Sequence, residues 1–299
     1  MKATLVHNPT AGNGAVTRDM LTALLHKANF TPSYQSSKIG ELTAALAEPA
    51  DLIVVAGGDG TVAKVLTQMP DRKVPVAILP LGTANNIASS FGIGGALDEI
   101  ALGLHHASER KLDIGMARGP WGCCWLVEGI GLGALVRTAE RLGKPNGSRV
   151  DKLDEARKAV RKMLKKVEPD RMRILVDDEP LPDAQLMVEI LNIACAGPRL
   201  FLVPETDMGD GLVDVAILEP DQRKEMRRWL KDKRPSGPPP LTVRRGRKVS
   251  IYWDGTPMHV DDDTPPFGDG KVAVEFELED RQTTILVPKK VDGDPGVPK

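Results

Sequence analysis

Residues 52–61 read LIVVAGGDGT, an apolar run followed directly by a glycine-rich loop. A fully apolar run of this length is typical of a strand in a parallel sheet that is buried on both faces. Residues 62–69 follow with a helical pattern, and a helix that begins directly after glycines presents unpaired backbone N–H groups to an anion. The stretch therefore predicts a strand, a phosphate-binding loop and a helix. A tight strand-to-helix turn without a ligand fits this single stretch equally well.

Two further polar loops follow predicted strands on either side of this stretch. Residues 3–6 precede the loop HNPTAGNG at 7–14, and residues 74–79 precede the loop PLGTANN at 80–86. In an open α/β sheet, ligands bind outside the carboxyl ends of the strands. Three glycine-bearing polar loops at three such ends favour phosphate binding over three unrelated turns.

Composition narrows the class of protein. The chain has 299 residues, with 41% hydrophobic and 27% charged residues, three cysteines and a formal net charge of −1. This length suggests about two domains, and the composition is that of a soluble globular protein. The charge excludes a globally basic nucleic-acid binder, and no apolar run reaches the roughly 18 residues of a membrane-spanning helix. The chain reads straight into a strand without a secretory signal, and its cysteines form no disulfide framework, so we expect a cytoplasmic setting.

The pattern of elements changes near Asp113. Strands alternate with helices before this residue, which predicts an open α/β sheet. Predicted strands dominate after it, with helices only near 151–167 and 221–233, which predicts an antiparallel β-sandwich. The expected parts are a nucleotide-binding α/β domain at 1–113, a β-sandwich at 114–288 and a polar tail at 289–299.

The three loops, in this order, resemble the diacylglycerol kinase catalytic-domain family of bacterial lipid kinases, which includes relatives of sphingosine kinases. NPTAG at 8–12 resembles the family's Asn-Pro-x-[Ser/Ala]-Gly opening. GGDGT at 57–61 matches the family loop but is shared with NAD kinases, and PLGTAN at 80–85 favours the lipid kinases. The resemblance continues through the second domain. It implies an α/β domain like that of phosphofructokinase, a β-sandwich, and ATP and Mg²⁺ as cofactors.

The resemblance also implies roles for individual residues. Asp59 suits holding Mg²⁺, or a water on Mg²⁺, beside the phosphates. Asp113 is a second candidate on the metal side. Asp210 and Asp214 are candidates for a structural metal site, although Asp210-Gly211 reads equally well as a hairpin turn. The residues expected to bind ATP are Asn8, Thr10, Gly57, Gly58, Asp59, Gly60, Thr61, Gly82 and Thr83.

The chain departs from the family pattern at the expected position of the catalytic base. The family carries Asp-Gly-Glu late in the chain, and this triplet is absent here. Residues 261–263 read Asp-Asp-Asp and precede a strand that ends in Val-Pro, as in the family, so we expect Asp261 to be the base and Asp263 to stand at the Glu position. Asp254, before Gly255, is the alternative, and a solvated acidic loop is the plainer interpretation of the acidic run. Asn86 stands where the family commonly has Asp, which removes one negative charge from the metal side.

Two basic segments of the sequence are relevant to whether the protein contacts a membrane or a nucleic acid. Residues 152–166 carry seven Lys or Arg against two acids, and residues 221–234 carry seven against three. Met226, Trp229 and Leu230 form an apolar stripe with a basic surround, which is typical of an interfacial helix and also of a surface helix packed on its own domain. We do not expect nucleic-acid binding, because neither segment is interleaved with aromatic residues.

The function expected from these features is an ATP- and Mg²⁺-dependent lipid kinase. It would transfer the γ-phosphate to a diacylglycerol-like or sphingoid hydroxyl at a membrane surface, with peripheral contact at the inner face. The alternatives are an NAD kinase and a nucleotide-binding regulator of the same fold without catalysis. The sequence leaves open whether the chain forms a homodimer.

Overall fold

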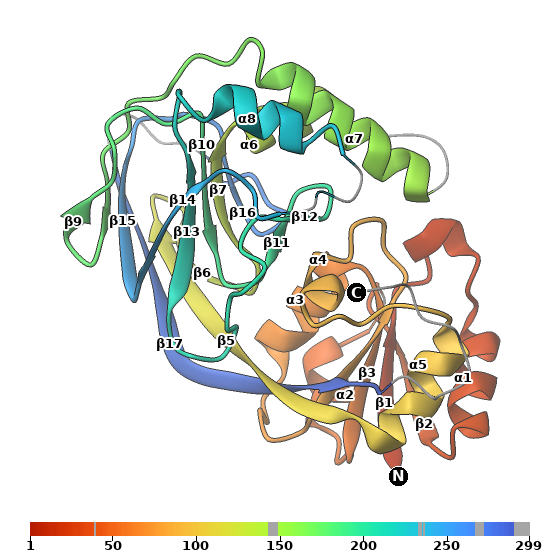
Figure 1. Cartoon of the computed structure of the whole chain (residues 1–299). Coiled ribbons are helices and arrows are strands. Elements are labelled where there is room, and N and C mark those ends of the chain that lie inside the picture. The colour runs from red at the N-terminus through yellow and green to blue at the C-terminus, as the bar shows by residue number, and fades with distance from the viewer. Residues whose placement is uncertain (39, 143–148, 233–234, 236, 267–271, 290–299) are drawn as a thin grey trace. The chain divides into compact units, whose positions relative to one another are not determined.

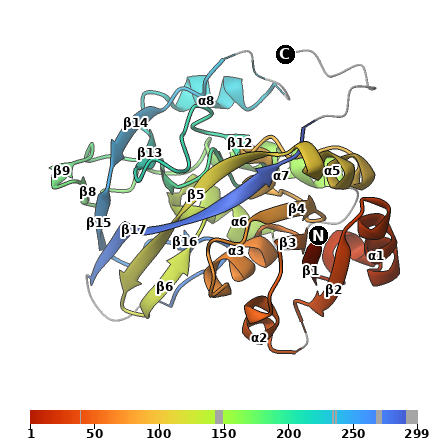
Figure 2. The same cartoon turned by 90° about the horizontal axis from the view of Figure 1, so that it is seen from below.

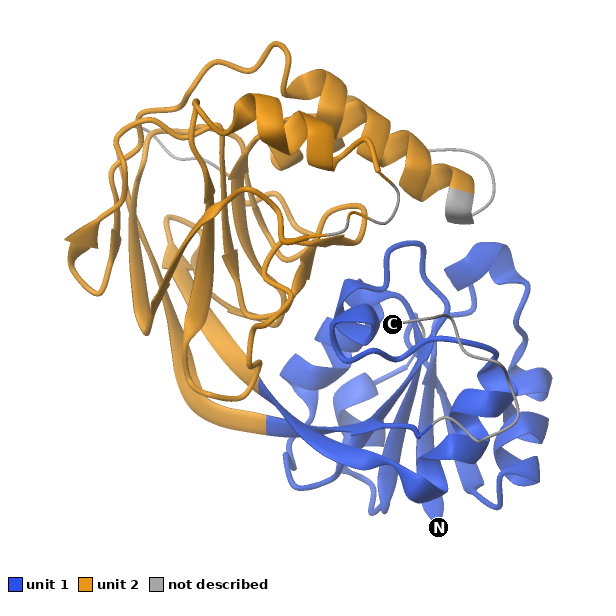
Figure 3. Cartoon of the chain, in the orientation of Figure 1, with its two compact units in different colours: residues 1–112, 283–299 blue, residues 113–282 orange. Residues whose placement is uncertain are grey.

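The computed structural model describes residues 1–38, 40–142, 149–232, 235, 237–266 and 272–289. The chain forms two compact units, the first of residues 1–112 with 283–299 and the second of residues 113–282 (Figure 3). Two long strands, β5 (Ser108–Gly119) and β17 (Val272–Val287), each contribute to both units.

The first unit is built on a parallel sheet with the strand order β2-β1-β3-β4-β17. Every residue of β3 is buried, which explains why this strand is apolar on both sides. The last part of β17 adds the fifth strand, because Ile285 and Leu286 pair in parallel with Val76 and Ala77. The other strands are β1 (Lys2–His7), β2 (Thr31–Ser36), β3 (Leu52–Gly57) and β4 (Val76–Pro80).

Helices follow the strands of this unit, as Figure 1 shows in red to yellow. The hydroxyl of Thr17 caps the first helix by accepting the N–H of Met20 at 3.3 Å. Strand–helix alternation confirms the α/β class expected for this part of the chain. The helices are α1 (Arg18–Lys27), α2 (Leu42–Ala47), α3 (Asp59–Gln68), α4 (Asn86–Ser90) and α5 (Leu97–Gly103), with 3-10 turns at Ala11–Gly14 and Leu104–His106.

The second unit is an antiparallel β-sandwich, as expected. One sheet holds the first part of β17 with β15, β8 and β9, and β5 pairs with both β17 and β6; β5 and β17 run side by side in Figure 2. The other sheet has the order β14-β13-β10-β7-β16. The strands not yet bounded are β6 (Gly122–Leu126), β7 (Gly129–Gly133), β8 (Ile174–Val176), β9 (Glu179–Pro180), β10 (Met187–Leu191), β11 (Cys195–Ala196), β12 (Leu200–Phe201), β13 (Val213–Leu218), β14 (Thr242–Gly246), β15 (Lys248–Trp253) and β16 (Met258–Val260).

Three helices of the second unit, α6 (Ala134–Leu142), α7 (Arg149–Met163) and α8 (Arg223–Trp229), contribute to a second core. On β10, Val188 and Ile190 belong to the core of the sandwich. Met187 and Leu191 belong instead to the core that the helices share. Successive side chains of a strand face opposite sides, so one face of this sheet packs on the other sheet and one on the helices.

Two of the three residues of the apolar stripe, Met226 and Leu230, pack inside the unit, and Trp229 is half-buried. Met226 is 0% exposed and Leu230 is 4% exposed, and both belong to the core shared with α6 and α7. These two side chains therefore stabilise the fold and do not face a membrane. None of the described helices is long and apolar enough to cross a bilayer.

The end of the chain differs from the expected division. We expected the second domain to extend to residue 288, whereas the structure groups residues from Thr283 onward with the first unit. The reason is the pairing of β17 with β4, which places the last strand in the parallel sheet. Most of the expected tail, residues 290–299, lies outside the described residues.

Candidate functional site

Three loops of the first unit follow strands that are neighbours in the sheet. The loops come after β1, β3 and β4, and these strands pair directly. Asn8 joins the first two loops, because its side-chain amide donates to the Thr61 hydroxyl at 3.2 Å. The side-chain Oδ1 of Asn8 in turn accepts the backbone N–H and the hydroxyl of Thr10. These three residues, predicted from two separate stretches, therefore belong to one hydrogen-bonded group.

The second and third loops approach each other through glycine backbones. A Cβ on Gly58 would lie 3.1 Å from the Cα of Gly82, and a Cβ on Gly82 would lie 2.6 Å from the Cα of Gly58. A Cβ on Gly57 would lie 2.6 Å from the Thr61 side chain. Glycine is therefore required here for close approach of the two loops.

Asp59 stands at the first position of α3 and connects it to α4. Its Oδ1 accepts the backbone N–H of Ile87 at 3.0 Å. The first N–H groups of a helix and the positive end of its dipole favour an anion at this position. Gly60 and Thr83 are exposed in their loops, and Asn86 is buried at the start of α4. The donors in these loops fit phosphate, and the carboxylate of Asp59 fits a hard cation beside it.

In the second unit, Asp261 is held by the backbone of the β6–β7 connection. Its Oδ2 accepts the N–H of Val127, and its Oδ1 accepts the N–H groups of Glu128 and Gly129, at 2.8–3.0 Å. Burial raises the pKa of Asp261 to about 6, although these three N–H groups favour the charged form. The side chain thus fixes a turn and keeps a pKa near neutrality.

Asp263 and Asp254 are both exposed, and they differ in what surrounds them. Asp263 exchanges two backbone hydrogen bonds with Val260, which closes the turn of residues 260–263 and leaves the carboxylate at the surface. The Oδ1 of Asp254 accepts the N–H and the hydroxyl of Thr256, which is a local turn.

Asp113 is a buried residue of the second unit. Its Oδ1 accepts the Nε2–H of Gln282 and its Oδ2 accepts the N–H of Gly211, both at 2.8 Å. Burial raises the pKa of Asp113, and these two donors partly offset the rise. The carboxylate therefore organises the 207–211 turn, a role that the sequence did not indicate.

Asp210 and Asp214 share a positive partner from the chain itself. Arg245 pairs with Asp210 and, through Nε, with Asp214 Oδ1 at 2.9 Å. Within the described ranges, no group of three or more His, Cys, Asp or Glu side chains is arranged to hold a metal ion. The guanidinium thus neutralises both carboxylates, for which the sequence suggests either a structural metal or a hairpin turn.

Sequence reasoning missed a buried pair, Glu189 and His259. Glu189 is 0% exposed, and the Nε2 of His259 lies 3.4 Å from its Oε2. The Nδ1 of His259 lies 2.8 Å from the carbonyl oxygen of Asp261. In the sequence, this pair was indicated only by Glu189, which is the single acid in the apolar run of residues 186–191.

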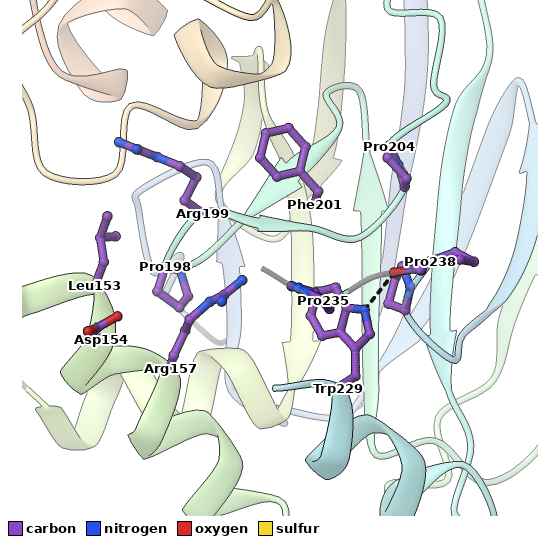
Figure 4. A pocket seen from close by; sticks show the side chains of 12 residues that line it. Leu153, Asp154, Arg157, Pro198, Arg199, Phe201, Pro204, Trp229, Pro235 and Pro238 are labelled. Atoms are coloured by element: carbon purple, nitrogen blue, oxygen red, sulfur yellow. Dashed lines mark hydrogen bonds between the residues drawn. The ribbon is translucent and has the colours of Figure 1, made fainter. Parts of the chain in front are cut away.

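The second unit also contains an apolar pocket of about 500 Å³. Figure 4 shows Arg157, Phe201, Trp229 and Pro238 around it. The indole N–H of Trp229 donates to the carbonyl of Gly237, and the guanidinium of Arg157 lies 5.9 Å from the Trp229 ring centre. An apolar lining that includes the cationic side chains of Arg157 and Arg199 suits an amphiphile.

Comparisons of sequence agree with these features. Residues 2–117 match the diacylglycerol kinase catalytic domain, and residues 139–286 match the YegS C-terminal NAD kinase beta sandwich-like domain. A diacylglycerol kinase of Mycobacterium tuberculosis is 26% identical over 245 residues, which cover 76% of each protein. A diacylglycerol kinase of Bacillus subtilis is 25% identical over 73% of this chain and 74% of that protein.

Comparisons of structure give the fold. A diacylglycerol kinase from Bacillus anthracis aligns with a TM-score of 0.65 at 18% identity, over 95% of this chain and 96% of that one. An NAD kinase from Archaeoglobus fulgidus, solved in complex with ATP, aligns with a TM-score of 0.52 at 13% identity, over 97% and 95% of the two chains. The fold is therefore the one that these two kinases share.

Proposed function

We propose that this chain, whose residues 2–117 match the diacylglycerol kinase catalytic domain and whose residues 139–286 match the YegS C-terminal domain, transfers the γ-phosphate of ATP to the hydroxyl of a lipid in an Mg²⁺-dependent reaction. The observation that carries this proposal is the joined set of loops after β1, β3 and β4. Phosphoryl transfer depends mainly on positioning and charge neutralisation, and these loops offer both.

On the nucleotide side, the loops would bind phosphate through backbone N–H groups and hydroxyls. The residues that would bind ATP are those predicted from the sequence: Asn8, Thr10, Gly57, Gly58, Asp59, Gly60, Thr61, Gly82 and Thr83. Asp59 would hold Mg²⁺, which neutralises phosphate charge when bound. Asp113 stays a weaker candidate for this task, because its carboxylate accepts hydrogen bonds from Gly211 and Gln282.

On the acceptor side, the lipid hydroxyl must lose a proton as the new P–O bond forms. We expected Asp261 to accept it, and its pKa of about 6 suits that task. Its carboxylate is nevertheless committed to three backbone N–H groups, whereas Asp263 is exposed in the same turn. We therefore propose that Asp263 accepts the proton and that Asp261 fixes the turn that presents it.

The apolar pocket of the second unit is the proposed site for a lipid chain. Phe201 and Trp229 would contact the chain, and Arg157 and Arg199 line the same pocket with positive charge. Basic side chains on α7 and α8 would favour an anionic membrane surface, at about 1 kcal/mol for each residue near the surface.

An NAD kinase is the second candidate, since the GGDGT loop and the overall fold are common to both kinds of kinase. A nucleotide-binding regulator is the third, since Asn86 and the Asp-Asp-Asp triplet depart from the family pattern. One assay separates the three functions. The purified protein is given γ-labelled ATP and Mg²⁺ with dioleoylglycerol or sphingosine in mixed micelles, or with NAD in solution. We expect label in a lipid and none in NAD. Label in NAD supports the second function, and ATP binding without any labelled product supports the third.

A further inference from the structure

A row of three residues crosses neighbouring strands of the second sheet. Glu189 on β10 pairs with Gly131 on β7, and Gly131 pairs with His259 on β16. Because side chains alternate along a strand, these residues face away from the sandwich core, to which their neighbours in sequence belong. Those neighbours are Ile130, Leu132, Val188, Ile190, Met258 and Val260.

Gly131 allows the two outer side chains to meet. A Cβ on Gly131 would overlap the Nε2 of His259 and lie 2.5 Å from the Oε2 of Glu189. With glycine on the central strand, Nε2 and Oε2 lie 3.4 Å apart. Both oxygens of Glu189 are buried, and neither forms a hydrogen bond with any other described residue. A buried carboxylate without other partners is costly, so the imidazole is its compensation.

The contacts of the His259 imidazole indicate which of its nitrogens carries a hydrogen. The Nδ1 of His259 faces the carbonyl oxygen of Asp261, which can only accept, so Nδ1 carries a hydrogen. The Nε2 of His259 faces the Oε2 of Glu189. Burial raises the pKa of Glu189. Burial acts to lower the pKa of His259, but the contact with Glu189 acts the other way and the pKa of His259 is raised. The other charged groups that act on the imidazole are Asp261 and Asp262.

We propose that Glu189 and His259 are positioning residues for the reaction proposed above, and that they hold the turn of residues 261–263 through the Asp261 carbonyl. Asp261 has a φ of +49°, in the left-handed region that residues other than glycine seldom adopt. Its carboxylate holds residues 127–129 while its carbonyl accepts from His259. The pair thus fixes both the edge strand β16 and the turn that carries Asp263.

Variants of Glu189 separate positioning from simple packing. In Glu189→Gln the amide can donate to Nε2 of a neutral imidazole, which keeps the hydrogen on Nδ1 and the turn in place. Glu189→Leu removes that partner, and His259→Phe removes both contacts. We expect kcat to fall by about tenfold or more in Glu189→Leu and His259→Phe, with the KM for ATP within about twofold, and to stay within about threefold in Glu189→Gln. His106→Gln, an exposed histidine of the first unit, serves as the matched control.

A spectroscopic measurement makes the test independent of the reaction. The backbone amide signals of Val127, Glu128 and Gly129 report whether Asp261 is still in place, even if the wild type phosphorylates no lipid. We expect these signals to shift in Glu189→Leu and to stay near their wild-type positions in Glu189→Gln. Unchanged amide signals in Glu189→Leu would overturn the inference. So would an unchanged kcat in that variant, or an equal loss of kcat in the Leu and Gln variants.

Discussion

Gly58 and Gly82 bring the loops after β3 and β4 into backbone contact: a Cβ on Gly82 would lie 2.6 Å from the Cα of Gly58. It would also lie 2.7 Å from Oδ1 of Asn85, whose amide donates to the carbonyl of Gly82 at 3.0 Å. Neither loop can accept a side chain here without moving. The geometry of the proposed nucleotide site therefore depends on this contact.

Gly82→Ala is expected to weaken ATP binding by about tenfold or more, because the added methyl group separates the loops. The matched control is Gly94→Ala, where a Cβ would meet no atom within 4 Å. Isothermal titration with ATP measures both variants. Equal affinity of Gly82→Ala and wild type would show that the loops do not bind ATP together.

Asp59→Asn is expected to raise the Mg²⁺ concentration needed for half-maximal activity by about tenfold, because the amide keeps an acceptor for the Ile87 N–H but loses the charge. Activity measured against Mg²⁺ concentration gives this value. Asp19→Asn, an exposed acid near the start of α1, should leave it unchanged. An unaltered Mg²⁺ requirement in Asp59→Asn would show that Asp59 does not hold Mg²⁺.

Asp263→Asn should impair catalysis, whereas Asp261→Ala should lower the stability of the fold. We expect Asp263→Asn to lower kcat by about 100-fold or more without changing the melting temperature, because it loses the proton acceptor only. Asp261→Ala leaves three backbone N–H groups without their acceptor, at about 1–3 kcal/mol each where they stay buried, so its melting temperature should fall. If Asp254→Asn were inactive while Asp263→Asn kept its activity, the base would be Asp254.

Stability should depend on pH through Asp261. Its pKa rises from 3.8 to about 6 on folding, so the folded state binds this proton more tightly than the unfolded state. The resulting stabilisation is fully present below pH 3.8 and is lost as pH rises through about 6. The free energy of unfolding, measured with urea, should therefore fall more between pH 4 and pH 7 for wild type than for Asp261→Asn. A difference between the two proteins that stays constant with pH would contradict this.

Phe201→Ala should raise the KM for a long-chain lipid by about tenfold, the equivalent of about 1.4 kcal/mol of lost apolar contact, and leave the KM for ATP unchanged. Phe201 is 38% exposed on the pocket wall. Tyr252→Ala, at 41% exposure and outside the pocket lining, is the control. Initial rates with long-chain and short-chain lipids measure the effect, and equal KM values for Phe201→Ala and wild type would place the lipid elsewhere.

The buried strands and their loops were predictable because their signals are local. The apolar run of residues 52–56 and the glycines after it indicate β3 and its loop without any tertiary information. The β2 strand was not predicted, because its residues, TPSYQS, are mostly polar and include Pro32. Proline is tolerated on an edge strand, and β2 stands at the edge of its sheet.

The parts that sequence reasoning missed depend on register between distant segments. Glu189 meets His259 only because β10, β7 and β16 align Glu189, Gly131 and His259 in one row. Arg245 reaches Asp210 and Asp214 because β14 pairs with β13. Neither relationship has a signal in residue spacing along the chain.

We propose above all that the three loops bind ATP for transfer to a lipid. The most direct measurement is the rate at which label passes from γ-labelled ATP to dioleoylglycerol or sphingosine in mixed micelles, for wild type beside Gly82→Ala and Gly94→Ala. We predict labelled lipid with wild type and Gly94→Ala, and a rate reduced by about tenfold or more with Gly82→Ala. Wild-type protein that binds ATP and labels neither lipid would contradict the account.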